Sequence, residues 1–237
     1  MIDFNEDGNI YTFAQSYIIA DGWTISMNSR VVLYLEGFDP SDDITITVGS
    51  VVNAVFAVNG STNLVFSAAT AGISLASISQ TSHITYNINS GATTMLVAQD
   101  RSEYGNLTIT GNGLIGSESG AITVAGNLFV DSGITLTVNG DLLARGNLVT
   151  GGASFEVDGS FTAENVQQDT SFGYIIAKAG NISVVANGAL SFDGVSSGKG
   201  SVSLNSNGNN ISVDGSIMAG SGAVDVNAGT GTVSLSG

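Results

Sequence analysis

A short segment of glycine, a polar or small residue and alternating aliphatic residues returns about every 20 residues, and this repeat constrains the fold more than any other feature. Counted from the first aliphatic residue of each segment, the successive steps are 21, 20, 34, 20 and 22 residues. A period of this length is typical of solenoids, in which each repeat packs only on its neighbours. The six aliphatic residues are Leu107, Leu128, Leu148, Ile182, Val202 and Val224.

Each repeat offers three short stretches in which apolar residues alternate with Ser, Thr, Asp or Asn. Alternation sends one set of side chains inward and the other to solvent. Three such faces cannot close a core alone, but stacking each strand in parallel on its counterpart at about 4.8 Å buries a continuous apolar column. The sequence therefore predicts an all-β fold, a parallel, right-handed β-helix with about three short strands per coil of 20–22 residues.

The same alternation predicts which residues point into the core. A register error of one residue would turn every one of them to solvent, so the prediction is strict. The inward residues are Leu128, Val130, Phe155, Val157, Ile182, Val184, Ile211 and Val213.

The domain organisation follows from how far the repeat extends. It can be traced back from Leu107 through Ile84 and Leu64 to Ile44, in steps of 23, 20 and 20 residues, so residues 44–237 are predicted to form the solenoid. Residues 1–43 hold the start of the chain and much of its aromatic content, and we expect either an aromatic-rich cap or irregular first coils there.

The 34-residue step between Leu148 and Ile182 predicts an insertion around residues 162–179 that leaves the solenoid wall as a loop. Binding functions are often placed on loops that a rigid scaffold holds. Phe172, Tyr174 and Lys178 are the predicted contacts of this interaction loop, and a tolerated insertion without function is the alternative.

Composition limits the classes of partner. The chain has a formal net charge of −15 and only five Lys and Arg residues, so it repels nucleic acid and anionic lipid headgroups. No stretch reaches the roughly 18 apolar residues of a membrane helix, and direct membrane insertion is not expected. The absence of cysteine removes disulfide and thiol chemistry.

One segment near the start of the chain matches half of a metal-binding loop. The stretch DFNEDGNI places oxygen ligands in the order of a calcium loop, at Asp3, Asn5, Asp7 and Asn9. The twelfth position of such a loop should supply a bidentate Glu, but Ala14 stands there. Two interpretations stay open, a calcium site and an acidic turn, and no other cofactor is predicted.

Two polar columns are predicted at the turns. Stacked amides of Asn106, Asn127, Asn147 and Asn181 are expected to form an asparagine ladder from coil to coil. Asn139, Asp158, Asp193 and Asp214 precede the turn glycine of successive coils and are expected in one row. Neighbouring carboxylates in that row would approach the spacing of a retaining glycosidase pair, whereas the alternative is that they only start turns.

These coils, such as GNLFV from Gly126 and FEVDG from Phe155, resemble those of filamentous-haemagglutinin-like and autotransporter-like bacterial surface adhesins over residues 64–237. The resemblance implies a non-catalytic structural or adhesive segment of a larger exported protein, acting as a stalk or fibre at the extracellular bacterial cell surface. Expected partners are neighbouring solenoid repeats, like subunits, or a surface receptor or glycan. No Ser/His/Asp, Cys/His or phosphate-loop signature is present, and no catalytic residue is predicted.

Two alternatives remain open for function. One is a carbohydrate-binding or carbohydrate-cleaving β-helix, and the other is a subunit of a head-to-tail self-assembling filament. The final stretch TVSLSG would leave the apolar edge of a coil uncovered, so we expect either a longer stalk that continues the stack or contact with a like subunit.

Overall fold

The computed structural model describes strand residues 2–4, 10–12, 24–27, 32–38, 43–48, 54–60, 63–66, 73–77 and 83–96, and then residues 103–117 and 120–237. Side chains are described within residues 104–116 and 120–237. The described residues contain strands and turns and no helix, so the all-β prediction is confirmed.

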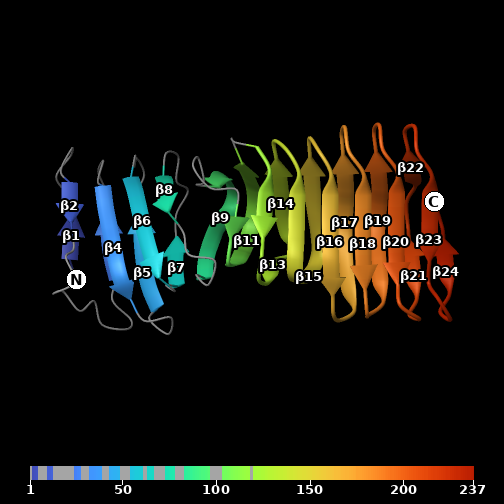
Figure 1. Ribbon diagram of the computed structural model, residues 1–237, viewed down its shortest axis with the longest axis horizontal. Helices are drawn as coiled ribbons and strands as arrows, with labels where there is room; N and C mark the ends of the chain where they lie inside the picture. Colours follow the sequence, from blue (N-terminus) through green and yellow to red (C-terminus); the bar gives the residue numbers. More distant parts are fainter. Residues whose placement is uncertain are drawn as a thin grey trace.

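The strands follow one another along a single axis (Figure 1). Those of the first half are β1 (Ile2–Phe4), β2 (Ile10–Thr12), β3 (Thr24–Met27), β4 (Val32–Phe38), β5 (Asp43–Val48), β6 (Ala54–Gly60), β7 (Asn63–Phe66), β8 (Ile73–Ser77), β9 (His83–Leu96), β10 (Glu103–Tyr104) and β11 (Asn106–Ser117). Those of the second half are β12 (Ile122–Val124), β13 (Leu128–Val130), β14 (Gly133–Val138), β15 (Leu142–Val157), β16 (Phe161–Val166), β17 (Thr170–Ala177), β18 (Ile182–Ala186), β19 (Leu190–Ser197), β20 (Val202–Ser206), β21 (Ile211–Val213), β22 (Ile217–Ala219), β23 (Val224–Asn227) and β24 (Val233–Leu235).

The pairings between these strands are parallel and join residues one coil apart, which confirms the parallel β-solenoid. The predicted line through Ile44, Leu64, Ile84 and Leu107 is present, residue for residue. The predicted boundary at residue 43 does not interrupt the pairing, because β3 pairs with β5 and also with β1. A second line of partners runs through Ile122, Leu142, Phe161, Ile182, Val202 and Val224.

The number of strands in a coil varies along the stack. The coil that begins at Ile122 has the three short strands β12, β13 and β14, as predicted. The coil of β18 and β19 has two longer strands, and the next sheet position divides again into β21 and β22. The core therefore stays continuous, although the positions of the corners between strands differ from coil to coil.

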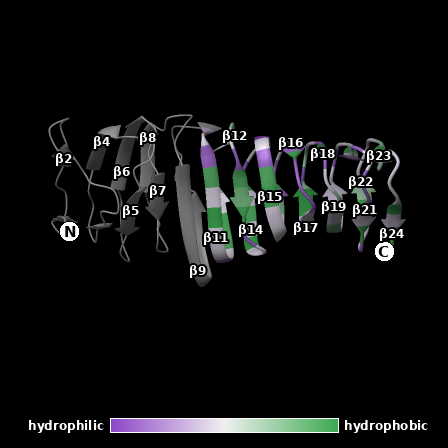
Figure 2. Ribbon diagram, turned by 90° about the horizontal axis from the view of Figure 1, so that it is seen from below, coloured by the Kyte–Doolittle hydropathy of each residue, from purple (hydrophilic) through white to green (hydrophobic). Residues whose placement is uncertain are grey.

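Alternating side chains fill the interior. β14 and β18 have strictly alternating buried and half-buried residues. Apolar residues recur in strand after strand (Figure 2). All eight residues predicted to point inward are at most 1 % exposed, which confirms their register: Leu128, Val130, Phe155, Val157, Ile182, Val184, Ile211 and Val213.

Four phenylalanines pack against one another in the core. Phe155 lies 5.1 Å from Phe161 and 6.0 Å from Phe172, measured between ring centroids. Phe172 stacks on Phe192 of the next coil at 5.0 Å with an interplanar angle of 9°. Offset and tilted aromatic pairs add to the stability that comes from burial. This cluster joins four strands, β15, β16, β17 and β19.

The predicted insertion around residues 162–179 is wrong. This segment forms β16 and β17, and both strands pair in the wall with the coils before and after them. The coil from Phe161 to its partner Ile182 spans 21 residues, like its neighbours. The error arose because the Gly-Asn pairs at 146–147 and 180–181 occupy different corners, so the 34-residue step compared positions that do not stack.

Tight corners require glycine where successive coils approach each other closely. A Cβ atom on Gly146 would collide with the carbonyl oxygen of Gly126 in the preceding coil. At another corner, a buried hydroxyl forms hydrogen bonds with backbone groups of the turn. Ser197 donates to the carbonyl of Gly180 at 2.8 Å and accepts from the N–H of Gly200 at 2.7 Å. Glycine therefore recurs at corners where the backbones of successive coils leave no room for a side chain.

Truncating Phe155 tests this core. Its side chain is fully buried, so Phe155→Ala is expected to lower the free energy of unfolding by about 3 to 5 kcal/mol, measured by urea denaturation. Phe129→Ala is the matched control because Phe129 is 38 % exposed on β13, and its change should stay within about 0.5 kcal/mol. A loss below about 1 kcal/mol for Phe155→Ala would contradict the register.

Candidate functional site

Side-chain amides at one corner bind the backbone of the next coil. The Oδ1 atoms of three asparagines accept N–H bonds from the residue one coil further along, at 2.8, 3.3 and 3.0 Å. The acceptors are Asn106, Asn127 and Asn147, and the donors are Asn127, Asn147 and Gln167. The predicted asparagine ladder is confirmed for these three acceptors, and we call this column the first ladder.

Asn181, the fourth residue predicted for that ladder, belongs to a second ladder at another corner. The N–H of Ser160 donates to Asp141 Oδ1 at 2.6 Å, and the N–H of Asn181 donates to Ser160 Oγ at 3.1 Å. Asn181 Oδ1 accepts from Ser201 at 2.8 Å, and Ser201 Oγ accepts from the N–H of Ala223 at 3.2 Å. Both ladders satisfy corner N–H groups that the strand pairing does not reach.

The acidic residues predicted to form one row fall into two columns. Asn139, Asp158 and Lys178 follow directly after paired residues of successive coils and stack at one corner. Asp193 and Asp214 follow another pair and stack at a different corner. The single row is therefore wrong, because the Asp-Gly pattern marks two corners of the coil. One pair of neighbouring carboxylates, Asp193 and Asp214, remains.

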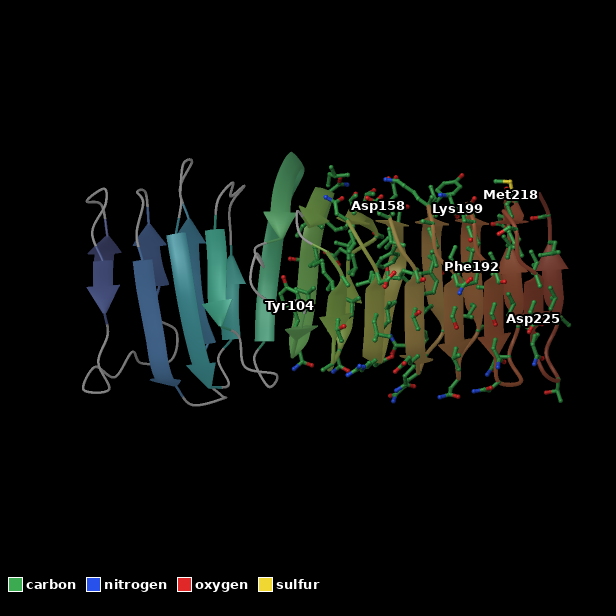
Figure 3. The ribbon with its side chains drawn as sticks, turned by 45° about the horizontal axis from the view of Figure 1, so that its top comes forward. Tyr104, Asp158, Phe192, Lys199, Met218 and Asp225 are labelled. Carbon is green, nitrogen blue, oxygen red and sulfur yellow. The ribbon has the colours of Figure 1, made fainter. Side chains whose placement is uncertain are left out.

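Asp158 forms an ion pair with Lys178 of the next coil. The distance between Lys178 Nζ and Asp158 Oδ1 is 2.6 Å, and both side chains are about half exposed. The hydrogen bond from Lys178 to Asp158 and the attraction of that charge raise the pKa of Lys178 above its ordinary value. Figure 3 shows Asp158 along one edge of the strands, away from Phe192 in the interior.

The three residues predicted to form an interaction loop have different environments. Phe172 is 2 % exposed and belongs to the phenylalanine cluster, so its prediction as a contact is wrong. Tyr174 is 55 % exposed, and its ring lies against the backbone of Gly194 in the next coil. Lys178 is exposed and paired with Asp158. Tyr174 and Lys178 therefore lie on the outside of a regular wall.

A third ladder contains a gap. Its four positions come immediately before strands of one wall: Asp169, Ala189, Asn210 and Thr232. Asp169 Oδ1 accepts the N–H of Ala189 at 2.8 Å, and Asn210 Oδ1 accepts the N–H of Thr232 at 3.0 Å. Ala189, which lies between these two rungs, has only a methyl group, so no side-chain acceptor extends from it towards Asn210.

A surface cavity of about 180 Å³ opens at this gap, and we call it the notch. Sequence reasoning missed the notch because its residues come from three coils, and only the register shows that an alanine interrupts a polar column. The notch is lined by Asp169, Thr170, Ser171, Ala189, Leu190, Ser191, Asn210 and Ser212. The hydroxyl of Ser191 donates to Ser171 Oγ at 2.7 Å.

The calcium half-loop at Asp3, Asn5, Asp7 and Asn9 lies outside the residues whose side chains are described. Among the described residues, no group of three His, Cys, Asp or Glu side chains is placed to hold a metal ion. The part of the chain that the structure describes contains no helix with the length and hydropathy to cross a membrane.

Comparison with known proteins gives no relative to argue from. No family model matches the sequence, and neither curated proteins nor solved structures give a significant match. The functional conclusions below therefore rest on the geometry of this chain.

Removing Asp158 tests the ion pair. Asp158→Asn is expected to lower the pKa of Lys178, because the hydrogen-bonded carboxylate holds that pKa above its ordinary value. NMR titration of the lysine side chain measures the change. Because the pKa is raised in the folded state, the pair stabilises the fold below the unfolded pKa of lysine, and this contribution is lost as the pH rises through the folded pKa.

Asp193→Asn is the matched control, since it removes a carboxylate from the other acidic column. It should leave the titration of Lys178 unchanged. An equal shift in both variants would mean that Lys178 responds to overall charge rather than to Asp158.

Proposed function

We propose that this chain is a non-catalytic structural or adhesive β-solenoid segment of a larger exported bacterial surface protein, where it acts as a stalk. The observation that carries the proposal is the continuity of the coil-to-coil contacts. Backbone pairing joins each described coil to the next, and from residue 104 onward an apolar core and side-chain ladders join successive coils as well. Such a stack is stiff along its axis and separates whatever is attached to its two ends.

The polar ladders favour a stiff stalk over a flexible array of repeats. Hydrogen bonds of the second ladder connect Asp141, Ser160, Asn181, Ser201 and Ala223 across five successive coils. Each such bond contributes about 0.5 to 1.5 kcal/mol, and together they oppose sliding or opening between coils. An exported location and the adhesin resemblance belong to the same proposal, and the low number of basic residues is compatible with them.

A distance measurement along the axis tests the stalk. Thr123 and Asp225 belong to one outward column of the wall and are separated by five coil steps. Because the chain has no cysteine, Thr123→Cys and Asp225→Cys can be spin-labelled without background. Pulsed electron paramagnetic resonance should give one narrow distance distribution, corresponding to a backbone separation of about 24 Å.

The second ladder provides the comparison. Asn181→Ala in the doubly labelled chain removes the acceptor of the Ser201 N–H and should broaden the distribution. Asn205→Ala, an outward change on β20 outside the ladder, should not. A distribution that is already broad in the parent chain would contradict a stiff stalk.

An assay of polysaccharide cleavage tests whether the chain is catalytic. The chain should release no reducing ends from a panel of polysaccharides. Release that Asp214→Asn abolishes would establish the carbohydrate-cleaving alternative through the remaining carboxylate pair and overturn the non-catalytic role.

A head-to-tail filament is a second candidate, and a specific observation favours it. The strands of the last described coil expose apolar side chains that are buried at the equivalent positions of earlier coils. Val224, Val233 and Leu235 are 48 %, 44 % and 61 % exposed, whereas Val202, Ile211 and Val213 beneath them are fully buried. A coil of a like subunit would cover this edge.

Charge placed on the apolar edge tests the filament. Sedimentation velocity of the parent chain should show association that increases with concentration, and Leu235→Lys should abolish it by burying a charge in the contact. Ser234→Lys adds the same charge to the outward side of the same strand and should leave association intact. A strictly monomeric parent chain at all concentrations would contradict this candidate.

A further inference from the structure

The interrupted third ladder places polar side chains around an open space. In the second ladder each of Asp141, Ser160, Asn181 and Ser201 offers an oxygen to the next coil. Ala189 is the one position of the third ladder between Asp169 and Asn210, and it offers none. Proteins break a repeated stabilising pattern chiefly where function requires it.

The notch has the size for one small polar group. Its volume is about 180 Å³. Sites for drug-sized ligands are larger, at about 300 to 1,000 Å³. The methyl group of Ala189 lines the notch, so a longer side chain at this position reduces the space.

The chemistry of the walls favours a neutral ligand with several hydroxyl groups. Ser171, Ser191 and Ser212 are successive partners in the strand pairing and form a row of serines, in which the hydroxyl oxygens of Ser171 and Ser191 lie 2.7 Å apart. Each hydroxyl can both donate and accept, Asp169 accepts, and the amide of Asn210 does both. A cluster of groups that can both donate and accept complements a ligand with several neighbouring hydroxyls, such as a sugar ring.

Charged ligands fit the notch less well. Asp169 and the net charge of −15 disfavour an anion. A calcium ion requires six to eight oxygen ligands and usually several carboxylates, whereas Asp169 is the single carboxylate of the notch.

We propose that the notch binds a single neutral sugar residue of a glycan, held by the serine row, Asp169 and Asn210 over the methyl group of Ala189. The site is shallow and forms few hydrogen bonds, so a free monosaccharide binds with millimolar affinity. Because the wall repeats every coil, a glycan chain can extend from the notch along the solenoid. This inference rests on the notch alone, and its failure would leave the stalk proposal untouched.

NMR titration of the full chain tests the site. The probes are the methyl glycosides of glucose, galactose, mannose and N-acetylglucosamine, with calcium chloride as a separate arm. At least one glycoside should produce saturable shifts of the amide signals of Ala189, Ser191 and Asn210. Ser212→Ala removes one hydroxyl without filling the space and should weaken that binding by about 3- to 10-fold.

A substitution that fills the notch should remove sugar binding without destabilising the fold. Ala189→Asn supplies the missing rung, so it should abolish the shifts and raise the melting temperature by about 2 to 4 °C. Ala121→Asn is the matched control, because Ala121 occupies the equivalent position before β12, outside the notch. It should leave sugar binding unchanged.

Three results would overturn the proposal. They are the absence of saturable shifts with every glycoside, unchanged binding by Ala189→Asn, and shifts at the notch with calcium alone. If Ala189→Asn does not fold, the result with Ser212→Ala decides, because unchanged affinity in that variant would place the sugar elsewhere.

Discussion

Parallel backbone pairing between successive coils is the constraint on which the rest of this structure depends. Each strand must find its hydrogen-bond partners one coil away, so residues about 20 positions apart lie directly above one another. Like positions therefore stack on like positions along the whole described solenoid. An inward aliphatic residue meets another, as Val184 meets Leu204, and a corner asparagine accepts a hydrogen bond from the backbone N–H of the next asparagine, as Asn127 does from Asn147.

Stacking at this spacing leaves little freedom at the corners. Gly146 is needed because the neighbouring coil approaches too closely for a Cβ atom, and polar residues are needed because corner N–H groups have no strand partner. The same requirement makes a departure from the pattern visible. Ala189 fits its corner sterically, but it leaves a hydrogen-bonding position empty between Asp169 and Asn210, and a cavity opens there.

The interior of the described coils is filled by apolar side chains, so the chemistry available to ligands lies on the walls, at the corners and at the exposed apolar edge. A stalk uses the axis of the stack, whereas a sugar site uses one corner of it, and the two proposed roles therefore do not compete for the same residues. The exposed edge at β24 is a third, separate surface.

The sequence by itself determined the all-β class, the approximate period and the inward residues such as Phe155 and Ile211, because alternation is a local property of each strand. Only the tertiary structure decided which corner each turn motif occupies. Gly-Asn precedes Leu148 at one corner and Ile182 at another, so motif spacing suggested an insertion where β16 and β17 in fact complete the wall. The notch at Ala189 depends on that same three-dimensional register, since an alanine becomes a gap only when Asp169 and Asn210 stack on either side of it.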